Sequence, residues 1–203
     1  RLNMHNVYGN RFVYDVNAAY NVFKNKKHKL KLFTSYSTAF IAPSLYQLYD
    51  GFSGNILLKP ETNKTIEFGF DYRLEKILSL EVVYFNRKEE DAIVYDSTTF
   101  SYANGNSDAT GFELSSEIRP INSLLFRVAY THVQKNNFED FNDYIPQNKL
   151  VAGVDVEIIK NTYINLQYRN TGERSVFDRY GSFGDSGKDV ALDRYEVFDL
   201  SAN

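Results

Sequence analysis

The stretch that decides the fold reads Thr65-Ile66-Glu67-Phe68-Gly69-Phe70-Asp71-Tyr72-Arg73-Leu74. Large apolar side chains alternate here with polar or small residues, so each kind recurs at every second position. A β-strand points successive side chains to opposite faces, whereas a helix would mix the two sets. The stretch therefore predicts a strand with one apolar face, made of Ile66, Phe68, Phe70, Tyr72 and Leu74, and one polar face.

The same alternation recurs along the whole chain and predicts about nine antiparallel strands, an all-β fold. Alternation is clearest in the third, fourth, fifth and seventh strands, whose apolar faces carry no formal charge. The expected strands run from Phe12 to Phe23, Leu30 to Phe40, Lys64 to Leu74, Leu78 to Val94, Tyr102 to Arg119, Leu124 to Gln134, Gln147 to Ile158, Thr162 to Thr171 and Tyr195 to Asn203.

Alternation by itself fits both a soluble β-sandwich and a membrane barrel, since each places one face in apolar surroundings. Strand length favours the barrel: soluble strands usually have about five or six residues, and about 9–11 are needed to cross a bilayer. Loop lengths favour it too, because short turns at one end and long loops at the other are typical of outer-membrane barrels. The long loops expected here are Ile41–Asn63, Tyr95–Ser101, Lys135–Pro146 and Gly172–Arg194.

Composition excludes several other classes of protein. The 203 residues include no Cys, so disulfides, thiolate metal sites and Cys nucleophiles are absent. A formal net charge of −3 argues against a nucleic-acid partner. The three His residues are far apart in the sequence, and no nucleophile or metal-ligand set accompanies the carboxylates. We therefore expect no catalytic residue, no metal, no cofactor and no enzyme activity.

Two loop segments combine aromatic and polar side chains, which suits ligand capture. One runs from Ser44 to Asp50 and the other from Phe138 to Tyr144. With the Gly54-Asn55 pair that follows the first segment, the candidate ligand-binding residues are Tyr46, Gln47, Tyr49, Asp50 and Asn55. Simple loop packing is the alternative explanation for both segments.

Several motifs, in order along the chain, resemble TonB-dependent outer-membrane receptors. They begin with Tyr36-Ser-Thr-Ala-Phe-Ile-Ala-Pro-Ser-Leu-Tyr-Gln-Leu-Tyr49 and continue with Gly54-Asn-Ile-Leu-Leu-Lys-Pro-Glu61. Glu67-Phe-Gly69 and Tyr102-Ala-Asn-Gly-Asn-Ser-Asp-Ala-Thr-Gly-Phe-Glu113 then fit later strands of that family. The resemblance extends over nearly the whole chain.

This resemblance implies a transmembrane barrel of 22 strands with a plugged lumen. Residues 1–203 would be a partial, C-terminal segment of that barrel, without the N-terminal plug domain and without the last strands. The resemblance also implies a place in the outer membrane of a Gram-negative bacterium. The partners would be outer-membrane lipid, the protein's own plug domain and the TonB complex. The polar strand faces would line the lumen and meet the plug, through Glu67, Asp71, Arg73, Glu81, Glu113 and Glu117.

The ligand remains open between two classes. The Tyr-Gln-Leu-Tyr, Gly-Asn and Pro-Glu segments are most similar to family members that import cobalamin, while ferric-siderophore receptors carry related segments at the same place. A small outer-membrane or surface β-protein that acts as an adhesin or binding module is the alternative from another class. An ion-pair ladder that faces water or a plug is the simpler explanation for the interior carboxylates.

Overall fold

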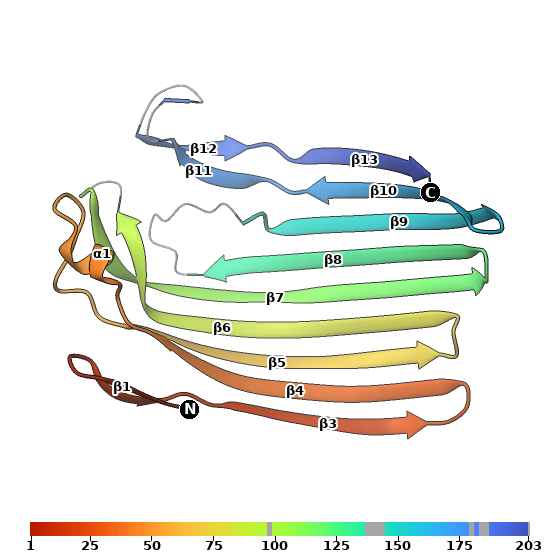
Figure 1. The fold of residues 1–203 in the computed structure, drawn as a ribbon, viewed down its shortest axis with the longest axis horizontal. Coiled ribbons are helices and arrows are strands. Elements are labelled where there is room, and N and C mark those ends of the chain that lie inside the picture. Colours follow the sequence, from red (N-terminus) through yellow and green to blue (C-terminus); the bar gives the residue numbers. More distant parts are fainter. Residues whose placement is uncertain (97–98, 137–144, 179–180, 183–186, 203) are drawn as a thin grey trace.

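The computed structural model describes residues 1–96, 99–136, 145–178, 181–182 and 187–202, and nine of its strands form one antiparallel sheet (Figure 1). The order across the sheet is β13-β10-β9-β8-β7-β6-β5-β4-β3. All nine predicted strands are confirmed, and Asn203 lies outside the described residues. Their bounds are β3 Asp15–Lys24, β4 His28–Ile41, β5 Glu61–Leu74, β6 Leu78–Asp96, β7 Ser101–Ile121, β8 Leu124–Asn136, β9 Asn148–Ile159, β10 Thr162–Thr171 and β13 Tyr195–Ala202.

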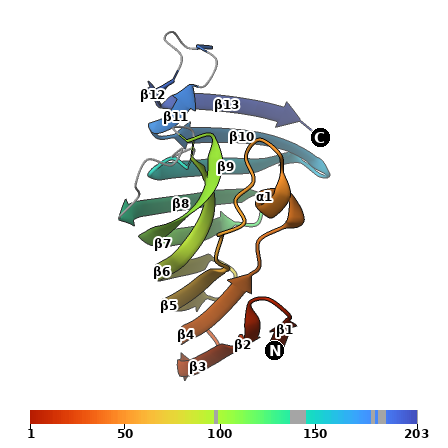
Figure 2. The ribbon, with the colours of Figure 1, turned by 90° about the vertical axis from the view of Figure 1, so that its left-hand side faces the viewer.

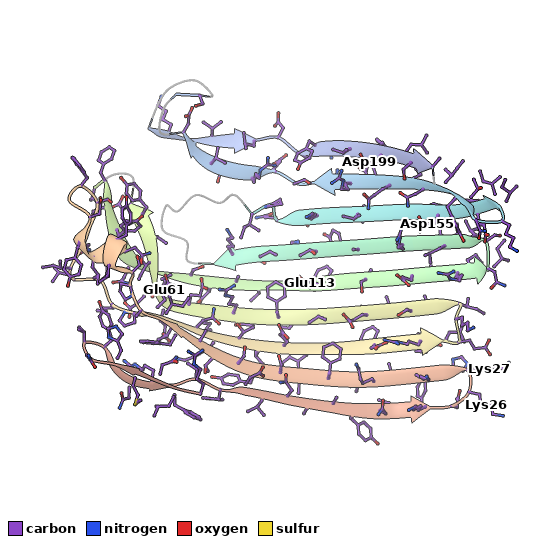
Figure 3. The ribbon with its side chains drawn as sticks, viewed as in Figure 1. Lys26, Lys27, Glu61, Glu113, Asp155 and Asp199 are labelled. Carbon is purple, nitrogen blue, oxygen red and sulfur yellow. The ribbon has the colours of Figure 1, made fainter. Side chains whose placement is uncertain are left out.

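Short turns join the strands at one end of the sheet, and the long connections lie at the other (Figure 1). Lys26 and Lys27 mark the short-turn end in Figure 3, and Glu61 marks the loop end. The two longest strands, β6 and β7, reach past their neighbours at the loop end and bend beside α1 (Leu45–Tyr49), as Figure 2 shows from that end. These two strands therefore carry the sheet out to the long loops.

Three small elements in this structure were not predicted. The helix α1 lies inside the long loop 42–60, and two hairpins flank the nine strands: β1 (Leu2–His5) with β2 (Gly9–Phe12), and β11 (Arg174–Asp178) with β12 (Lys188–Leu192). The helix and each strand of the two hairpins have only four or five residues. Such segments are too short to show a period of two or of 3.6 in the sequence.

The register aligns the apolar positions into one continuous face. A row across seven strands reads Tyr20, Leu32, Phe70, Val82, Leu114, Tyr130, Leu150. From β4 to β9 this face holds no Asp, Glu, Lys or Arg between the row of Leu74, beside the short turns, and the row of Ile66. At about 3.4 Å per residue the band is about 27 Å tall along the strand, close to the roughly 25 Å of an outer-membrane barrel.

The apolar face is exposed, and there is almost no hydrophobic core. Among the described residues, Leu58 and Val176 are the only buried Leu, Ile, Val, Met or aromatic side chains. Phe68 on the apolar face is 51% exposed, whereas Asp71 on the opposite face is 8% exposed. A soluble sandwich buries its apolar face, so this sheet has the opposite arrangement, which is that of a barrel wall.

The sheet is open within the described part of the chain, with β3 and β13 as its two edge strands. Both edges carry exposed apolar side chains, including Tyr20 and Phe198. No helix among the described residues is long and apolar enough to cross a membrane.

Candidate functional site: the polar face and the loop at its mouth

The five carboxylates and one arginine predicted to line a lumen share the face opposite Phe70. Asp71 is paired in register with Glu81, and Glu117 is paired with Ser79, which in turn faces Arg73. Glu113 lies near the middle of the sheet in Figure 3. The structure therefore places Glu67, Asp71, Arg73, Glu81, Glu113 and Glu117 on one polar face. That this face lines a plugged lumen remains a prediction.

Asp71 is the centre of a charge cluster on this face. Both of its carboxylate oxygens accept hydrogen bonds from the guanidinium of Arg73, each at 3.1 Å, and the ammonium of Lys31 lies 3.6 Å away. Bidentate pairing of this kind is stronger than a single ion contact. Elsewhere on the face, the hydroxyl of Ser35 donates to Glu67 at 2.8 Å.

Three other carboxylates on the polar face have no such partner. Glu81, Glu113 and Glu117 make no side-chain hydrogen bond or ion pair in the described part of the chain. They are therefore available to a segment or ligand that approaches this face.

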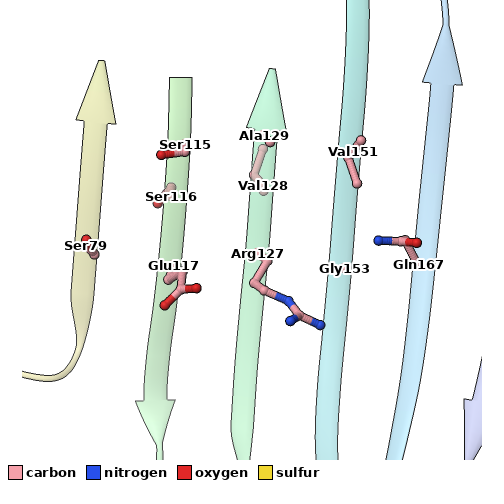
Figure 4. A pocket seen from close by; sticks show the side chains of 10 residues that line it. All are labelled: Ser79, Ser115, Ser116, Glu117, Arg127, Val128, Ala129, Val151, Gly153 and Gln167. Atoms are coloured by element: carbon pink, nitrogen blue, oxygen red, sulfur yellow. The ribbon is translucent and has the colours of Figure 1, made fainter. Parts of the chain in front are cut away.

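A shallow cavity of about 480 Å³ lies over the polar face between β6 and β10 (Figure 4). Its floor consists of small residues, Ser79, Ser115, Ala129 and Gly153, while Glu117, Arg127 and Gln167 stand around it. Arg127 is already paired with Asp155 at 2.6 Å. Small side chains allow another backbone to come close, so this cavity suits an extended polar segment.

The second part of the candidate site is the loop 42–60, which contains α1. Ser44 caps α1: its hydroxyl accepts from the amide of Gln47, and the Gln47 side chain accepts from the amide of Ser44 at 2.8 Å. This capping box satisfies amides that a helix start leaves without partners. The Oε1 atom of Gln47 is therefore used to start the helix.

Hydrogen bonds also fix this loop to the outer end of β7. The side chain of Asn55 donates to the carbonyl of Tyr102 at 2.8 Å, and the amide of Tyr102 donates to the carbonyl of Ser53 at 2.9 Å. Asn104 and Lys59 exchange two more bonds, of 2.8 and 2.9 Å. Two sequence motifs far apart in the chain therefore form one unit.

Asp50 holds the next turn of the loop. Its carboxylate accepts from the hydroxyl of Ser53 at 2.7 Å and from the amides of Ser53 and Phe52 at 3.0 and 3.3 Å. The Ser53 hydroxyl, followed by its amide, lowers the pKa of Asp50 below its ordinary value. The folded loop therefore favours the ionised form of Asp50.

We expect Asp50→Asn to make proteases cleave the loop around Phe52 several-fold faster than in the wild type at neutral pH. The wild-type loop should stay resistant down to about pH 4, the ordinary value for Asp. Because the pKa of Asp50 is lower in the folded loop, the ionised carboxylate stabilises the loop until the pH falls through that lower pKa. Limited proteolysis, with pepsin in the acid range, measures this. Ser53→Ala should behave like Asp50→Asn, and equal cleavage of Asp50→Asn and wild type would contradict the assignment.

The side chains that this loop leaves free are aromatic and aliphatic. Tyr46 is 61% exposed and Tyr49 is 69% exposed, and the neighbouring Phe52 is 99% exposed. The ring of Tyr46 packs edge-on against Tyr102 at 6.2 Å between centroids. Of the five predicted ligand-binding residues, the two tyrosines thus offer open surface, and Gln47, Asp50 and Asn55 have hydrogen bonds within the loop unit.

A family model described as TonB dependent receptor-like, beta-barrel matches residues 3–203. The chain belongs to this family. The match covers the nine-stranded sheet and the loop unit together, so both parts of the candidate site lie within it. Members of this family are receptors and transporters, and the adhesin alternative has no such support.

Individual relatives agree with the family. The Vitamin B12 transporter BtuB of Vibrio cholerae serotype O1 is 39% identical over 85 residues, which is 41% of this chain and 14% of that protein. Among solved structures, the ferripyoverdine receptor of Pseudomonas aeruginosa has a TM-score of 0.71 at 19% identity, covering 96% of this chain and 27% of its own. The siderophore receptor PirA of Acinetobacter baumannii has a TM-score of 0.72 at 17% identity, covering 99% and 36%.

The matched segments are only part of these relatives. The 85 matched residues span 14% of the curated relative, and the chain covers 27% and 36% of the two solved receptors. The two solved receptors are less than 20% identical to this chain in sequence, so their similarity shows the fold alone.

Two residues of the loop unit were not singled out as functional from the sequence of this family member. In the sequence, Tyr102 and Asn104 belong only to a strand motif, and the structure shows that they anchor the loop 42–60. The second predicted ligand-capture loop, Phe138–Tyr144, lies outside the described residues. No group of three or more His, Asp or Glu residues that could hold a metal is found in the described ranges.

Proposed function

We propose that this chain is part of the barrel wall of an outer-membrane receptor that imports cobalamin with energy supplied through TonB. The observation that carries the choice of ligand is the 39% identity over 85 residues with a vitamin B12 transporter. The family match supports the receptor as such. The outer membrane of a Gram-negative bacterium is the proposed location, since the exposed apolar band needs lipid.

In this proposal the long loops face outward and the short turns face the periplasm, as is general for such barrels. A plug domain, proposed to precede this segment in the complete receptor, occupies the lumen. The cavity of Figure 4, with its small floor residues and the free carboxylate of Glu117, is the proposed contact for an extended segment of that plug. TonB acts through the plug and not through the residues of this chain.

The loop 42–60 collects ligand in this proposal. Tyr46 and Tyr49 supply open aromatic surface, and the polar residues Gln47, Asp50 and Asn55 keep the loop in shape. Rigid aromatic side chains give contact area at small entropic cost, which is why they are common at binding sites. A ferric-siderophore receptor is the second candidate. It is supported by the similarity between the loop segments of this chain and those of ferric-siderophore receptors.

The test is equilibrium binding of cyanocobalamin to the detergent-purified complete receptor, beside a panel of ferric siderophores. We expect saturable cobalamin binding, weakened about tenfold or more by the double change Tyr46→Ala and Tyr49→Ala, equivalent to about 1.4 kcal/mol. Tyr163→Ala, near the opposite end of the sheet, is the matched control and should bind normally. Binding of a siderophore without cobalamin would select the second candidate, and binding of neither would reject both.

A further inference from the structure

A second cavity lies at the loop end of the polar face. It is separate from the cavity shown in Figure 4 and from the loop 42–60. Its volume is about 490 Å³, within the usual range of small-molecule sites. Residues from β9, β10, β11 and β13 line it: Lys149, Arg169, Thr171, Arg174, Tyr195 and Val197, with Pro146. The register pairs Lys149 with Thr171 and Thr171 with Tyr195, so these residues stand side by side.

Three cations line this cavity, and two of them have no ion-pair partner among the described residues. Arg169 is paired with Asp199, whose carboxylate lies 2.6 Å away. Lys149 and Arg174 form no ion pair in the described part of the chain. The cavity therefore keeps two positive charges for an incoming group.

Of these two cations, Arg174 has the clearer evidence of a missing hydrogen-bond partner. Its Nη1 atom is buried and has no hydrogen-bond acceptor, the only such side-chain atom among the described residues. Its guanidinium also lies over the ring of Tyr195, 5.3 Å from the centroid, which holds the group in place. A buried donor without an acceptor is costly, and charged donors most of all. An anionic oxygen in the cavity would pair with the charge of this guanidinium, since Arg174 lines the cavity.

We infer that this cavity binds a phosphate or carboxylate group carried by the imported ligand, held by Arg174 and Lys149. The inference rests on the proposed function, because it takes the ligand to pass the loop end of the lumen. The cavity is far larger than a single carboxylate side chain requires, which favours a ligand over an internal acid. Cobalamin fits this chemistry because its nucleotide loop contains a phosphodiester.

The experiment compares cyanocobalamin with cobinamide, which lacks the phosphodiester, on the complete receptor. Arg174→Gln and Lys149→Gln should each weaken cobalamin binding about tenfold, the size expected for a charged hydrogen bond. Both should leave cobinamide binding within about twofold, since this interaction has no counterpart there. Lys160→Gln removes the same charge from the short turn between β9 and β10 and is the matched control, with no change for either probe.

Failure of the cobalamin proposal is distinguishable from failure of the anion site. If cobalamin does not bind, the same variants are tested with an anionic ferric tris-catecholate and a neutral ferric tris-hydroxamate, and selective loss of the anionic complex supports the site. If neither binds, inorganic pyrophosphate is titrated into wild type and Arg174→Gln, and only binding that Arg174→Gln abolishes supports it. Equal loss for charged and neutral probes, or no loss, overturns the inference. So does a lowered melting temperature of Arg174→Gln with unchanged affinity, because that identifies an internal acid as the partner.

Discussion

Replacing Phe70 with Lys should sharply reduce the amount of complete receptor that assembles in the outer membrane. Phe70 stands in the middle row of the charge-free face, between Leu32 and Val82. A lysine at the lipid-facing midplane of a barrel costs roughly 2–4 kcal/mol. That is a large part of the free energy of unfolding of a typical folded protein, about 5–15 kcal/mol. Heat-modifiable migration of membrane extracts measures assembly, since folded and unfolded barrels migrate differently.

Val83→Lys is the matched control, because it places the same charge one row away on the opposite face. Val83 is paired with Gly69 on one side and with Glu113 on the other. A lysine there meets a carboxylate that has no partner, so assembly should be close to normal. Glu67→Gln on the same face should also be mild, with only the hydrogen bond from Ser35 weakened. Equal defects in Phe70→Lys and Val83→Lys would contradict the assignment of the two faces.

Gly111→Ala should produce the second large effect, loss of stable pairing between β7 and β8. A Cβ atom on Gly111 would come closer than 3.0 Å to the backbone carbonyl oxygen of His132 and would lie 2.6 Å from the ring of Phe85. The ring could move, but the carbonyl oxygen belongs to the neighbouring strand. We expect a loss of about 3 kcal/mol or more, at the upper end for overpacking, seen as a lowered midpoint of denaturant unfolding.

Gly153→Ala is the control for this substitution. Gly153 lies on the same polar face two strands away, and the nearest atom to its added Cβ would be the carbonyl oxygen of Leu166 at 3.7 Å. That is an ordinary contact, so the variant should unfold within about 1 kcal/mol of wild type. An equal destabilisation of the two variants would show that glycine flexibility, and not the close approach of Phe85 and His132, decides the effect.

The sequence alone determined which way each side chain of the strands points. Phe70 and Asp71 fall on opposite faces because successive strand residues must, and their preference for lipid or water says which face is which. The long strands, the short turns and the family motifs could be read in the same local way. Hydrophobic periodicity does not predict the five-residue helix α1, because this helix is shorter than two helical turns.

Only the tertiary structure decided what these residues touch. Asn55 and Asp50 are polar loop residues of the kind that bind ligands. In the structure, however, the side chain of Asn55 donates to the carbonyl of Tyr102, 47 positions away. The Asp50 carboxylate closes a turn of its own loop. Lys149 and Arg174 line one cavity because Lys149 is paired with Thr171 at the end of β10, and Arg174 follows three residues later at the start of β11. The pattern of each strand follows from the preference of its own residues for water or for an apolar environment. The contacts between distant residues depend instead on strand pairing and register, which no single segment of the sequence determines.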